Sequence, residues 1–349
     1  MSPPRRRSLT GIKPTGVPHL GNYLGAIRPA LELAKANDAF YFIADLHALT
    51  STPSREELIE QTYSVAATWL ALGLDPEETH FYRQSDIPEV TQLAWLLSCV
   101  LPLGMLTRAH SFKEAVDNRG LAPDDVRHGL FSYPVLMAAD ILLFDADVVP
   151  VGKDQKQHLE IAQEAARKVN LTYGEGTLKI PEAAIDERVM TIPGIDGEKM
   201  SKSRDNGVDL FMDDKPLKKR IGKIVTDSRA LGEPLFTEKE TVFQLYSLFA
   251  DAAQVDLLRR QYASGRKDPA RADDAFADPS ENYFGWGHAK GALFEVVRDT
   301  FSGARGEYQR LMADRAYLDQ VLARGADKAR EVATPVLERV WRAVGIRPA

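Results

Sequence analysis

Strand-like and helix-like segments alternate through the first two hundred residues of this 349-residue chain. Four apolar runs have the length and composition of strands: Ser8–Ile12, Phe40–Asp45, His80–Arg83 and Asp147–Val151. Helical patterns accompany them at Asn22–Ala36, Ser54–Leu72, from Pro88, at Tyr133–Leu143 and at Asp154–Lys168. This alternation predicts an α/β fold with a Rossmann-like parallel sheet and helices on both faces. In such sheets ligands bind at the carboxyl ends of the strands.

The pattern changes beyond about Asp205, where long helical segments replace the alternation. They cover Lys215–Val225, Val242–Ala252, Gln254–Ser264, Ala289–Phe301 and Ala316–Val344. We therefore predict two domains, a Rossmann-like domain over 1–205 and an α-helical domain over 206–349 whose last helix packs back on the first. Gly325 and Pro335 predict a break or kink in that last helix.

Composition excludes some classes of protein. The net charge of −6 argues against a general nucleic-acid binder, because polyanions favour basic proteins. The segment Lys215–Lys223 is locally basic, and it is read equally well as a binding surface or as a solvated helix face. The longest apolar run, Val90–Leu106, is interrupted by polar residues; it predicts a buried helix that breaks at Pro102, not a membrane span. The single cysteine, Cys99, excludes an internal disulfide and favours a reducing, cytoplasmic setting.

The segment Lys199-Met200-Ser201-Lys202-Ser203 is the most informative local motif. It places two ammonium groups three positions apart among small hydroxyl residues, behind a flexible Gly197. Such a pair can surround a triphosphate with positive charge. Two lysines at this spacing more often belong to a solvated face, but the complete five-residue string is much rarer.

A second candidate phosphate-binding segment lies near the N-terminus. Its glycines, Gly11, Gly16 and Gly21, permit close backbone approach to a ligand. We expect Asn22 to cap the following helix, whose free N–H groups beside His19 would suit a developing negative charge, with His19 and Asn22 as donors. Histidine-containing Gly/Pro loops are also common without catalysis. Together with the lysine segment, this one predicts an enzyme that holds ATP at both ends and makes an adenylate.

Two further segments suggest ligand contacts. Gly152 would let a nucleotide lie against the backbone and Asp154 would accept hydrogen bonds from ribose, although in isolation Asp154 is better read as a helix cap. Helical spacing puts Tyr133, Met137 and Asp140 on one face. A carboxylate buried there requires a donor, either an arginine elsewhere or a ligand N–H, and an indole offers one donor and no acceptor.

These residues resemble those of the class I aminoacyl-tRNA synthetases, and within that class the tryptophanyl-tRNA synthetase family, over nearly the whole chain. His19-Leu20-Gly21-Asn22 is similar to the first class signature, which usually ends in a second histidine, and Lys199–Ser203 matches the second signature unchanged. Tyr133–Asp140 and Val151–His158 are similar to segments of the tryptophan family. The tyrosine-specific family is the nearest alternative.

The resemblance implies a role for each residue of the site. It implies catalytic roles for His19, Asn22, Lys199 and Lys202. It implies ATP contacts at Lys13, Pro14, Thr15, Gly21, Asn22, Gly152, Lys153, Asp154, Val189, Lys199, Met200, Ser201, Lys202 and Ser203. For the amino acid it implies that Asp140 reads the indole N–H, that Met137 and His47 line the pocket, and that Tyr133 and Gln155 bind the amino group. It further implies ATP as substrate with Mg²⁺ carried by the nucleotide and no protein-bound metal, L-tryptophan and tRNA(Trp) as partners, anticodon recognition by the helical domain, and a homodimer.

The chain departs from this family at two positions. Lys13 stands where many bacterial relatives have glutamine, and Ala115 stands where they carry a second lysine after the one matching Lys113. Lys113 or Lys153 would then bind pyrophosphate. Two alternatives to the ligase remain: a synthetase-like paralog that binds tryptophan and ATP without charging tRNA, and a nucleotidylyltransferase, which would give no reason for the Asp140 pocket.

Overall fold

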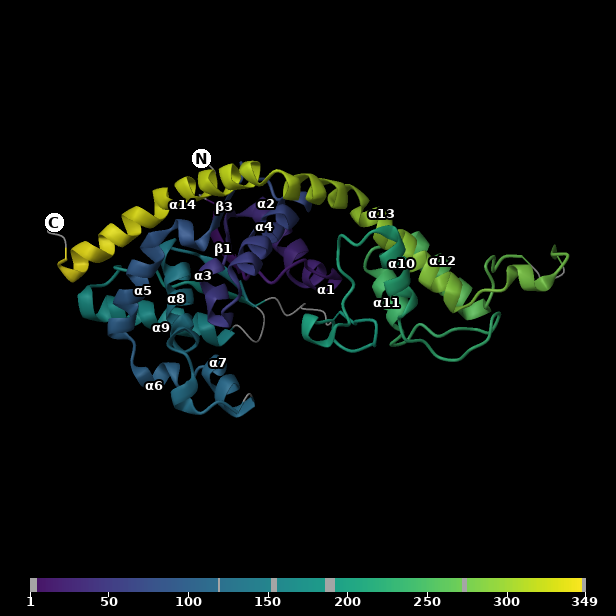
Figure 1. Cartoon of the computed structure of the whole chain (residues 1–349), viewed down its shortest axis with the longest axis horizontal. Coiled ribbons are helices and arrows are strands. Elements are labelled where there is room, and N and C mark those ends of the chain that lie inside the picture. The colour runs from purple at the N-terminus through teal and green to yellow at the C-terminus, as the bar shows by residue number, and fades with distance from the viewer. Residues whose placement is uncertain (1–4, 119, 152–155, 186–191, 272–274, 347–349) are drawn as a thin grey trace. The chain divides into compact units, whose positions relative to one another are not determined.

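The structure is a computed structural model that describes residues 5–118, 120–151, 156–185, 192–271 and 275–346 (Figure 1). The chain forms two compact units, and each is described by itself. The first comprises Met1–Gly16, Pro29–Val189 and Leu311–Ala349, and the second comprises Val17–Arg28 and Met190–Arg310. The predicted functional division at residue 205 stays a prediction.

A parallel sheet forms the centre of the first unit. In the described part of the chain it has five strands in the order β3-β2-β1-β4-β5. They are β1 (Arg7–Ile12), β2 (Asp38–Ile43), β3 (Thr79–Arg83), β4 (Val148–Val151) and β5 (Glu182–Ile185). The sheet confirms the predicted α/β class. The sequence did not reveal β5, because its residues Glu-Ala-Ala-Ile include three of low strand propensity.

The helices of the described residues follow the predicted alternation. Those before residue 190 are α1 (Leu20–Asn22), α2 (Arg28–Ala36), α3 (Asp45–Ala48), α4 (Arg55–Ala71), α5 (Pro88–Val100), α6 (Leu103–Leu106), α7 (His110–Lys113), α8 (His128–Leu143) and α9 (Lys156–Tyr173). Ser54 caps α4, since its hydroxyl accepts from the Glu57 N–H and the Glu57 carboxylate accepts from the Ser54 N–H. Between α1 and α2 the chain makes a π-helical turn, Tyr23–Ile27, where the sequence predicted one continuous helix.

Apolar residues from sheet and helices form one core. It joins Phe40 and Phe42 of β2 to Leu93 of α5, Ala138 of α8 and Ala329 of the C-terminal helix. Burial of such apolar surface is the main favourable term in folding.

The apolar run Val90–Leu106 is only partly buried. It breaks at Pro102, as predicted, and Pro102 lies directly before α6. However, Trp95 is 72% exposed and Leu103 is 68% exposed, so the prediction of a buried helix was wrong for one face. No helix within the described residues combines the length and the apolar character needed to cross a bilayer.

The last helix, α14 (Arg315–Val344), is continuous, so the predicted break at Gly325 or Pro335 was wrong, and the alternative of a kink stays a prediction. Gly325 instead permits close packing: a Cβ there would lie 1.8 Å from the carbonyl oxygen of Phe81 in β3. Figure 1 shows α14 lying along β3, which is the edge strand. A helix in this place covers backbone groups that an edge strand would otherwise expose.

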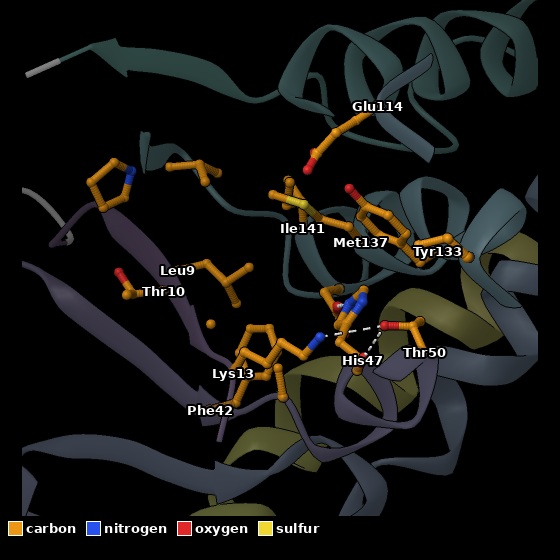
Figure 2. A pocket seen from close by; sticks show the side chains of 16 residues that line it. Leu9, Thr10, Lys13, Phe42, His47, Thr50, Glu114, Tyr133, Met137 and Ile141 are labelled. Atoms are coloured by element: carbon orange, nitrogen blue, oxygen red, sulfur yellow. Dashed lines mark hydrogen bonds and ion pairs between the residues drawn. The ribbon is translucent and has the colours of Figure 1, made fainter. Parts of the chain in front are cut away.

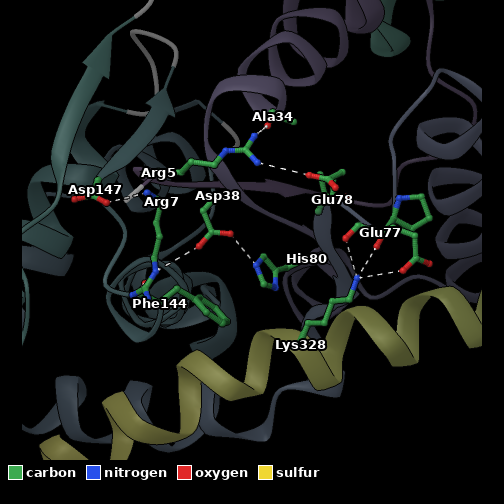
Figure 3. A network of polar contacts seen from close by, with 12 residues as sticks. Arg5, Arg7, Ala34, Asp38, Glu77, Glu78, His80, Phe144, Asp147 and Lys328 are labelled. Carbon is green, nitrogen blue, oxygen red and sulfur yellow. Dashed lines mark hydrogen bonds and ion pairs between the residues drawn. The ribbon is translucent and has the colours of Figure 1, made fainter. Parts of the chain in front are cut away.

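Ion pairs and hydrogen bonds join the amino ends of the strands (Figure 3). Asp38, at the start of β2, accepts from His80 Nε2 at 2.9 Å and lies 3.6 Å from Arg7 Nε. These two groups hold the pKa of Asp38 below its usual value, the hydrogen bond from His80 most strongly. The Arg7 N–H donates to Asp147 at 2.8 Å, and Lys328 of α14 donates to the carbonyl of Glu77 at 3.0 Å. This polar network stabilises the end of the sheet at which the strands begin, opposite their carboxyl ends.

The second unit is helical. It contains α10 (Asp214–Gly222), α11 (Thr241–Ser247), α12 (Ala252–Ser264) and most of α13 (Trp286–Ala313). Val17–Arg28 belongs to it because Tyr23 packs edge-on against Phe301 of α13, with ring centroids 5.0 Å apart, and Arg28 donates to the carbonyl of Leu248. The first signature segment therefore folds with this unit, which the sequence did not indicate.

Candidate functional site

A pocket opens at the carboxyl ends of β1 and β2, where the parallel sheet was expected to bind ligands (Figure 2). Its cavity has a volume of about 360 Å³, which lies within the range of roughly 300–1,000 Å³ typical of small-molecule sites. Leu9, Gly11 and Phe42 form part of its wall. A larger residue than Gly11 would have to displace the Phe42 ring, because a Cβ here would lie 2.5 Å from it.

Asp140 is the buried acid of this pocket. It is 2% exposed. Its Oδ2 accepts from His47 Nε2 at 3.0 Å, and Gln84 Nε2 donates to both oxygens, at 2.9 Å to Oδ1 and 2.8 Å to Oδ2. Its donors are therefore a histidine and an amide and not the arginine that the sequence left open. Burial raises the pKa of Asp140, and the hydrogen bonds from His47 and Gln84 oppose that rise. Because a carboxylate has about four acceptor positions, Oδ1 keeps capacity for a ligand N–H.

The other residues predicted for the amino-acid pocket line the same cavity. Tyr133 and Met137 come from α8, where Tyr133 lies two turns and Met137 one turn before Asp140. In Figure 2 their side chains lie together on one wall. The Tyr133 hydroxyl is 2.9 Å from His158 Nε2, which orients it. His47 adds a ring edge-on to Tyr133, with centroids 5.9 Å apart. The structure thus brings together Asp140, Met137, Tyr133 and His47, and their binding roles stay predictions.

Lys13 also reaches this pocket (Figure 2). Its ammonium group donates to Ser51 Oγ at 2.7 Å and to Thr50 Oγ1 at 3.4 Å, and Thr50 in turn donates to the carbonyl of His47. The ammonium group of Lys13 is therefore linked through Thr50 to the backbone of His47. Of its predicted neighbours, Pro14 is buried and Thr15 is exposed.

Several predicted residues cannot be placed. Gly152, Lys153, Asp154, Gln155 and Val189 lie outside the described residues. Ala115 is buried, whereas Lys113 is exposed at the end of α7. A lysine side chain at position 115 would start from a buried backbone position. Of the two lysines predicted to bind pyrophosphate, Lys113 lies within the described residues and Lys153 does not.

In the second unit, His19 caps the short helix α1. The Asn22 N–H donates to His19 Nδ1 at 3.2 Å, and the His19 N–H donates to Asn22 Oδ1 at 3.0 Å. The prediction that Asn22 is the cap was wrong, since it occupies the third helical position. The prediction of free N–H groups was also wrong, because Leu20 N donates to the carbonyl of Val208 and Gly21 N to Met200 Sδ.

The imidazole of His19 is held neutral. It is 5% exposed, and its pKa is lowered to about 4, first by burial and then by the charge of Lys202. Since Nδ1 accepts from Asn22, the proton of the neutral ring is on Nε2. At neutral pH His19 is thus a hydrogen-bond donor through Nε2 and not a cation.

The lysine segment lies on a hairpin followed by a tight turn. Lys199 pairs with Pro193 in an antiparallel bridge, and the Met200 N–H donates to the carbonyl of Ile192 at 2.8 Å. Lys202 begins a 3-10 turn that ends at Arg204. Both lysines are exposed. The hydroxyls of Ser201 and Ser203 lie 3.2 Å apart.

The two signature segments contact each other directly, although about 180 residues separate them in sequence. The contact is the Gly21–Met200 bond at 3.3 Å, and the flanking chain pairs as well, since the Leu210 N–H, after the lysine segment, donates to the carbonyl of Pro18, just before His19, at 3.1 Å. A Cβ on Gly21 would lie 3.0 Å from the His19 ring and 3.4 Å from Met200 Cβ. The structure therefore assembles His19, Gly21, Asn22 and the lysine segment within one unit.

Sequence reasoning missed two buried residues of the site. Gln84 directly follows β3, so the rule that polar residues after parallel strands carry function would have found it. Asn206 follows the lysine segment, and no spacing or pattern marks it. Their places in the site follow from hydrogen bonds. Gln84 donates to Asp140, which is distant in sequence, and Asn206 accepts from Ser201 across a turn.

The chain matches known synthetases over almost its full length. The model of the family "tRNA synthetases class I (W and Y)" matches residues 3–302. The tryptophan–tRNA ligase of Pseudomonas aeruginosa is 46% identical over 349 residues, covering 98% of this chain and 74% of the relative. That of Xylella fastidiosa is 47% identical over 348 residues, covering 98% and 76%. The crystal structure of tryptophanyl-tRNA synthetase from Campylobacter jejuni, complexed with ADP and tryptophan, superposes with a TM-score of 0.87 at 42% identity and covers 97% of this chain and 99% of that chain. The chain therefore belongs to the class I tRNA synthetases of the tryptophan and tyrosine family.

Proposed function

We propose that this enzyme is a tryptophan–tRNA ligase. It activates L-tryptophan with ATP and transfers the amino acid to the 3′ end of tRNA(Trp). The carboxylate of tryptophan attacks the α-phosphorus, the bond to the bridging oxygen breaks, and pyrophosphate leaves. The terminal ribose hydroxyl then attacks the carbonyl carbon of the adenylate, loses its proton, and displaces AMP.

The observation that carries this proposal is the buried carboxylate of Asp140. His47 and Gln84 orient it while Oδ1 keeps an acceptor position. An indole N–H donates to that position and brings no acceptor with it. A tyrosine hydroxyl would also place its own oxygen, an acceptor, beside the acceptor oxygens of the carboxylate. The curated relatives at 46–47% identity are tryptophan–tRNA ligases, which supports tryptophan over tyrosine.

Nucleotide binding is assigned to both signature segments. ATP is the substrate, and the relative from Campylobacter jejuni was crystallised with ADP. Lys199 and Lys202 neutralise the departing pyrophosphate, and His19 donates through Nε2 to the reacting phosphate. The ATP contacts assigned among the described residues are completed by Lys13, Pro14, Thr15, Gly21, Asn22, Met200, Ser201 and Ser203. By resemblance the assignment extends to Gly152, Lys153, Asp154 and Val189 for ATP, and to Gln155 for the amino group of tryptophan. Mg²⁺ carried by ATP supplies further neutralisation of phosphate charge.

The helical residues 206–349 are assigned to recognition of the tRNA anticodon. Lys215, Lys218, Lys219 and Lys223 on and after α10 are exposed. They give a protein of net charge −6 a local basic surface for a polyanion.

Two assays on the purified protein test the activity. Tryptophan-dependent exchange of pyrophosphate into ATP reports adenylate formation, and aminoacylation reports charging of tRNA(Trp). We expect both activities, loss of both on chelation of Mg²⁺, and restoration on its return. A tRNA(Trp) with a changed anticodon should be charged poorly while exchange is unaffected. Exchange without charging of any tRNA would identify the paralog, and exchange supported by tyrosine alone would identify the tyrosine enzyme.

The enzyme is assigned as a homodimer, as its family resemblance implies. Trp95 on α5 and Leu103 on α6 expose large apolar side chains, and exposed apolar surface is typical of an interaction site. Sedimentation should give about twice the mass of the 38.7 kDa chain. Trp95→Glu should weaken the dimer, whereas Leu171→Glu, at a still more exposed apolar residue on α9, should leave it intact. A wild-type monomer at micromolar concentration would contradict the assignment.

We assign the enzyme to the cytoplasm, where tRNA is charged. Its single cysteine, Cys99, is exposed on α5 and no disulfide is needed for the fold. Fractionation of cells that express the chain would test this location, and recovery in a membrane fraction would contradict it.

A further inference from the structure

Asn206 is a buried amide directly behind the lysine segment. It is 1% exposed. Its side chain makes three hydrogen bonds: Oδ1 accepts from the Ser201 N–H at 2.7 Å, and Nδ2 donates to Asp196 Oδ1 at 2.8 Å and to the carbonyl of Lys199 at 3.1 Å. The amide thus uses both its acceptor and its donors within one loop.

These bonds connect the turn before the lysine segment to the backbone of the segment itself. The carbonyl of Lys199 and the N–H of Ser201 flank Met200, and Asp196 lies in the turn before them. The backbone of Asn206 adds a fourth bond, because its carbonyl accepts from the Ile195 N–H at 2.9 Å. One residue therefore ties the arm before Lys199 to the turn that carries Lys202.

The preceding arm is shaped to receive this side chain. A Cβ on Gly194 would lie 2.5 Å from the Cγ and Nδ2 atoms of Asn206, so only glycine leaves the necessary space. Gly197 closes the turn with φ of +83°, a conformation that glycine adopts without strain. The buried amide and the two glycines form one built feature of the loop.

Holding the backbone at Lys199 and Ser201 matters for the reaction because lysine side chains are long and flexible. Two ammonium groups act together on pyrophosphate only when the backbone positions from which they extend are fixed. The two residues that Asn206 holds flank Met200, whose sulfur accepts from the Gly21 N–H beside His19. The same amide thereby supports both signature segments.

We propose that Asn206 is a positioning residue for the lysine segment: it does not touch substrate, and it holds the backbone of Lys199 and Ser201 so that Lys199 and Lys202 act on the leaving pyrophosphate. This inference rests on the proposed function for its kinetic consequence. Its structural consequence, a less ordered lysine segment when the amide is removed, stands independently.

Two substitutions separate the bonds of the amide. Asn206→Asp keeps the size and the acceptor for Ser201, but it removes both donor bonds and puts a second carboxylate beside Asp196. Asn206→Ala removes all three bonds. Asn282 provides a matched control in the same unit: it is also 1% exposed, its Oδ1 accepts from the Asp268 N–H at 2.8 Å, and its Nδ2 donates to the Asp268 carbonyl at 3.3 Å.

Steady-state pyrophosphate exchange tests the kinetic role. Because misplacement by about 1 Å can cost on the order of 100-fold in rate, we expect both Asn206 variants to lower kcat by roughly 10–100-fold, with the KM for tryptophan unchanged. Asn282→Ala should lose thermal stability to a similar degree with a normal kcat. Equal effects of Asn206→Ala and Asn282→Ala on kcat at matched folded fraction would overturn the inference, because the role would then be structural only.

Limited trypsin digestion without substrates tests the loop independently of activity. Lys199 and Lys202 are exposed cleavage sites, and we expect cleavage there to be at least about 10-fold faster in Asn206→Ala than in the wild type or in Asn282→Ala, since local opening controls such cleavage. Unchanged cleavage would overturn the inference even if the enzyme is active. Faster cleavage in a protein without tryptophan-dependent exchange would instead show that the proposed function had failed and that the loop restraint is real.

Discussion

Replacing Lys199 or Lys202 with alanine is expected to slow adenylate formation by about 10²–10³, comparable to losing one preorganised donor at a transition state. Negative charge builds up on the bridging oxygen as the bond to the α-phosphorus breaks, and each ammonium group neutralises part of it. Rapid-quench measurement of the first turnover, or pyrophosphate exchange, gives the rate. The affinity for tryptophan alone should stay unchanged, since its predicted pocket lies around Asp140.

The control for this experiment is Arg204→Ala, which removes an exposed cation from the end of the same 3-10 turn. It distinguishes a specific role of the two lysines from a general effect of loop charge. A normal first-turnover rate in both lysine variants would contradict the assignment of the lysine segment to catalysis. Rates lowered equally by Arg204→Ala would point to nonspecific charge.

The second prediction is that Asp140→Ala loses tryptophan selectivity far more than ATP affinity. In the wild type, a bound phenylalanine leaves a buried carboxylate position without its donor, and sites built to hydrogen-bond a substrate group reject analogues that lack it by about 10⁴–10⁵. Removing the carboxylate removes that penalty. The ratio of kcat/KM for tryptophan to that for phenylalanine, measured by pyrophosphate exchange, should therefore fall by a factor approaching this range.

This variant also loses stability, because the side chains of Gln84 and His47 lose their acceptor at a cost of about 1–3 kcal/mol for each buried donor. Glu89→Ala is the matched control. Glu89 is a buried carboxylate of α5 that accepts from Arg330 at 2.7 Å, and it is not among the residues lining the pocket. It should lower the unfolding temperature without altering selectivity. If Asp140→Ala activated tryptophan with the parental rate and selectivity, the pocket assignment would be wrong.

Local patterns were sufficient for much of the architecture. The apolar runs at β1 to β4 and the helical periodicity between them predicted a parallel sheet, because each strand buried on both faces must be apolar by itself. β5 escaped because its four residues carry no such pattern, and its place depends on pairing with β4. Gly325 was misread as a helix breaker because the sequence does not show that α14 must approach the backbone of β3.

The same division holds at the site. The lysine segment, the histidine loop and the face of α8 with Asp140 were visible in the sequence, because residue types at short spacing limit the chemistry available to them. Tertiary structure alone decided which groups satisfy Asp140, why His19 is neutral, and how Asn206 restrains the loop. Those outcomes depend on burial and on partners brought together from distant segments, as with Gln84 and Asp140 or Gly21 and Met200. A pattern of neighbouring residues records what a segment can do, whereas burial and long-range contacts determine which of those possibilities the folded chain uses.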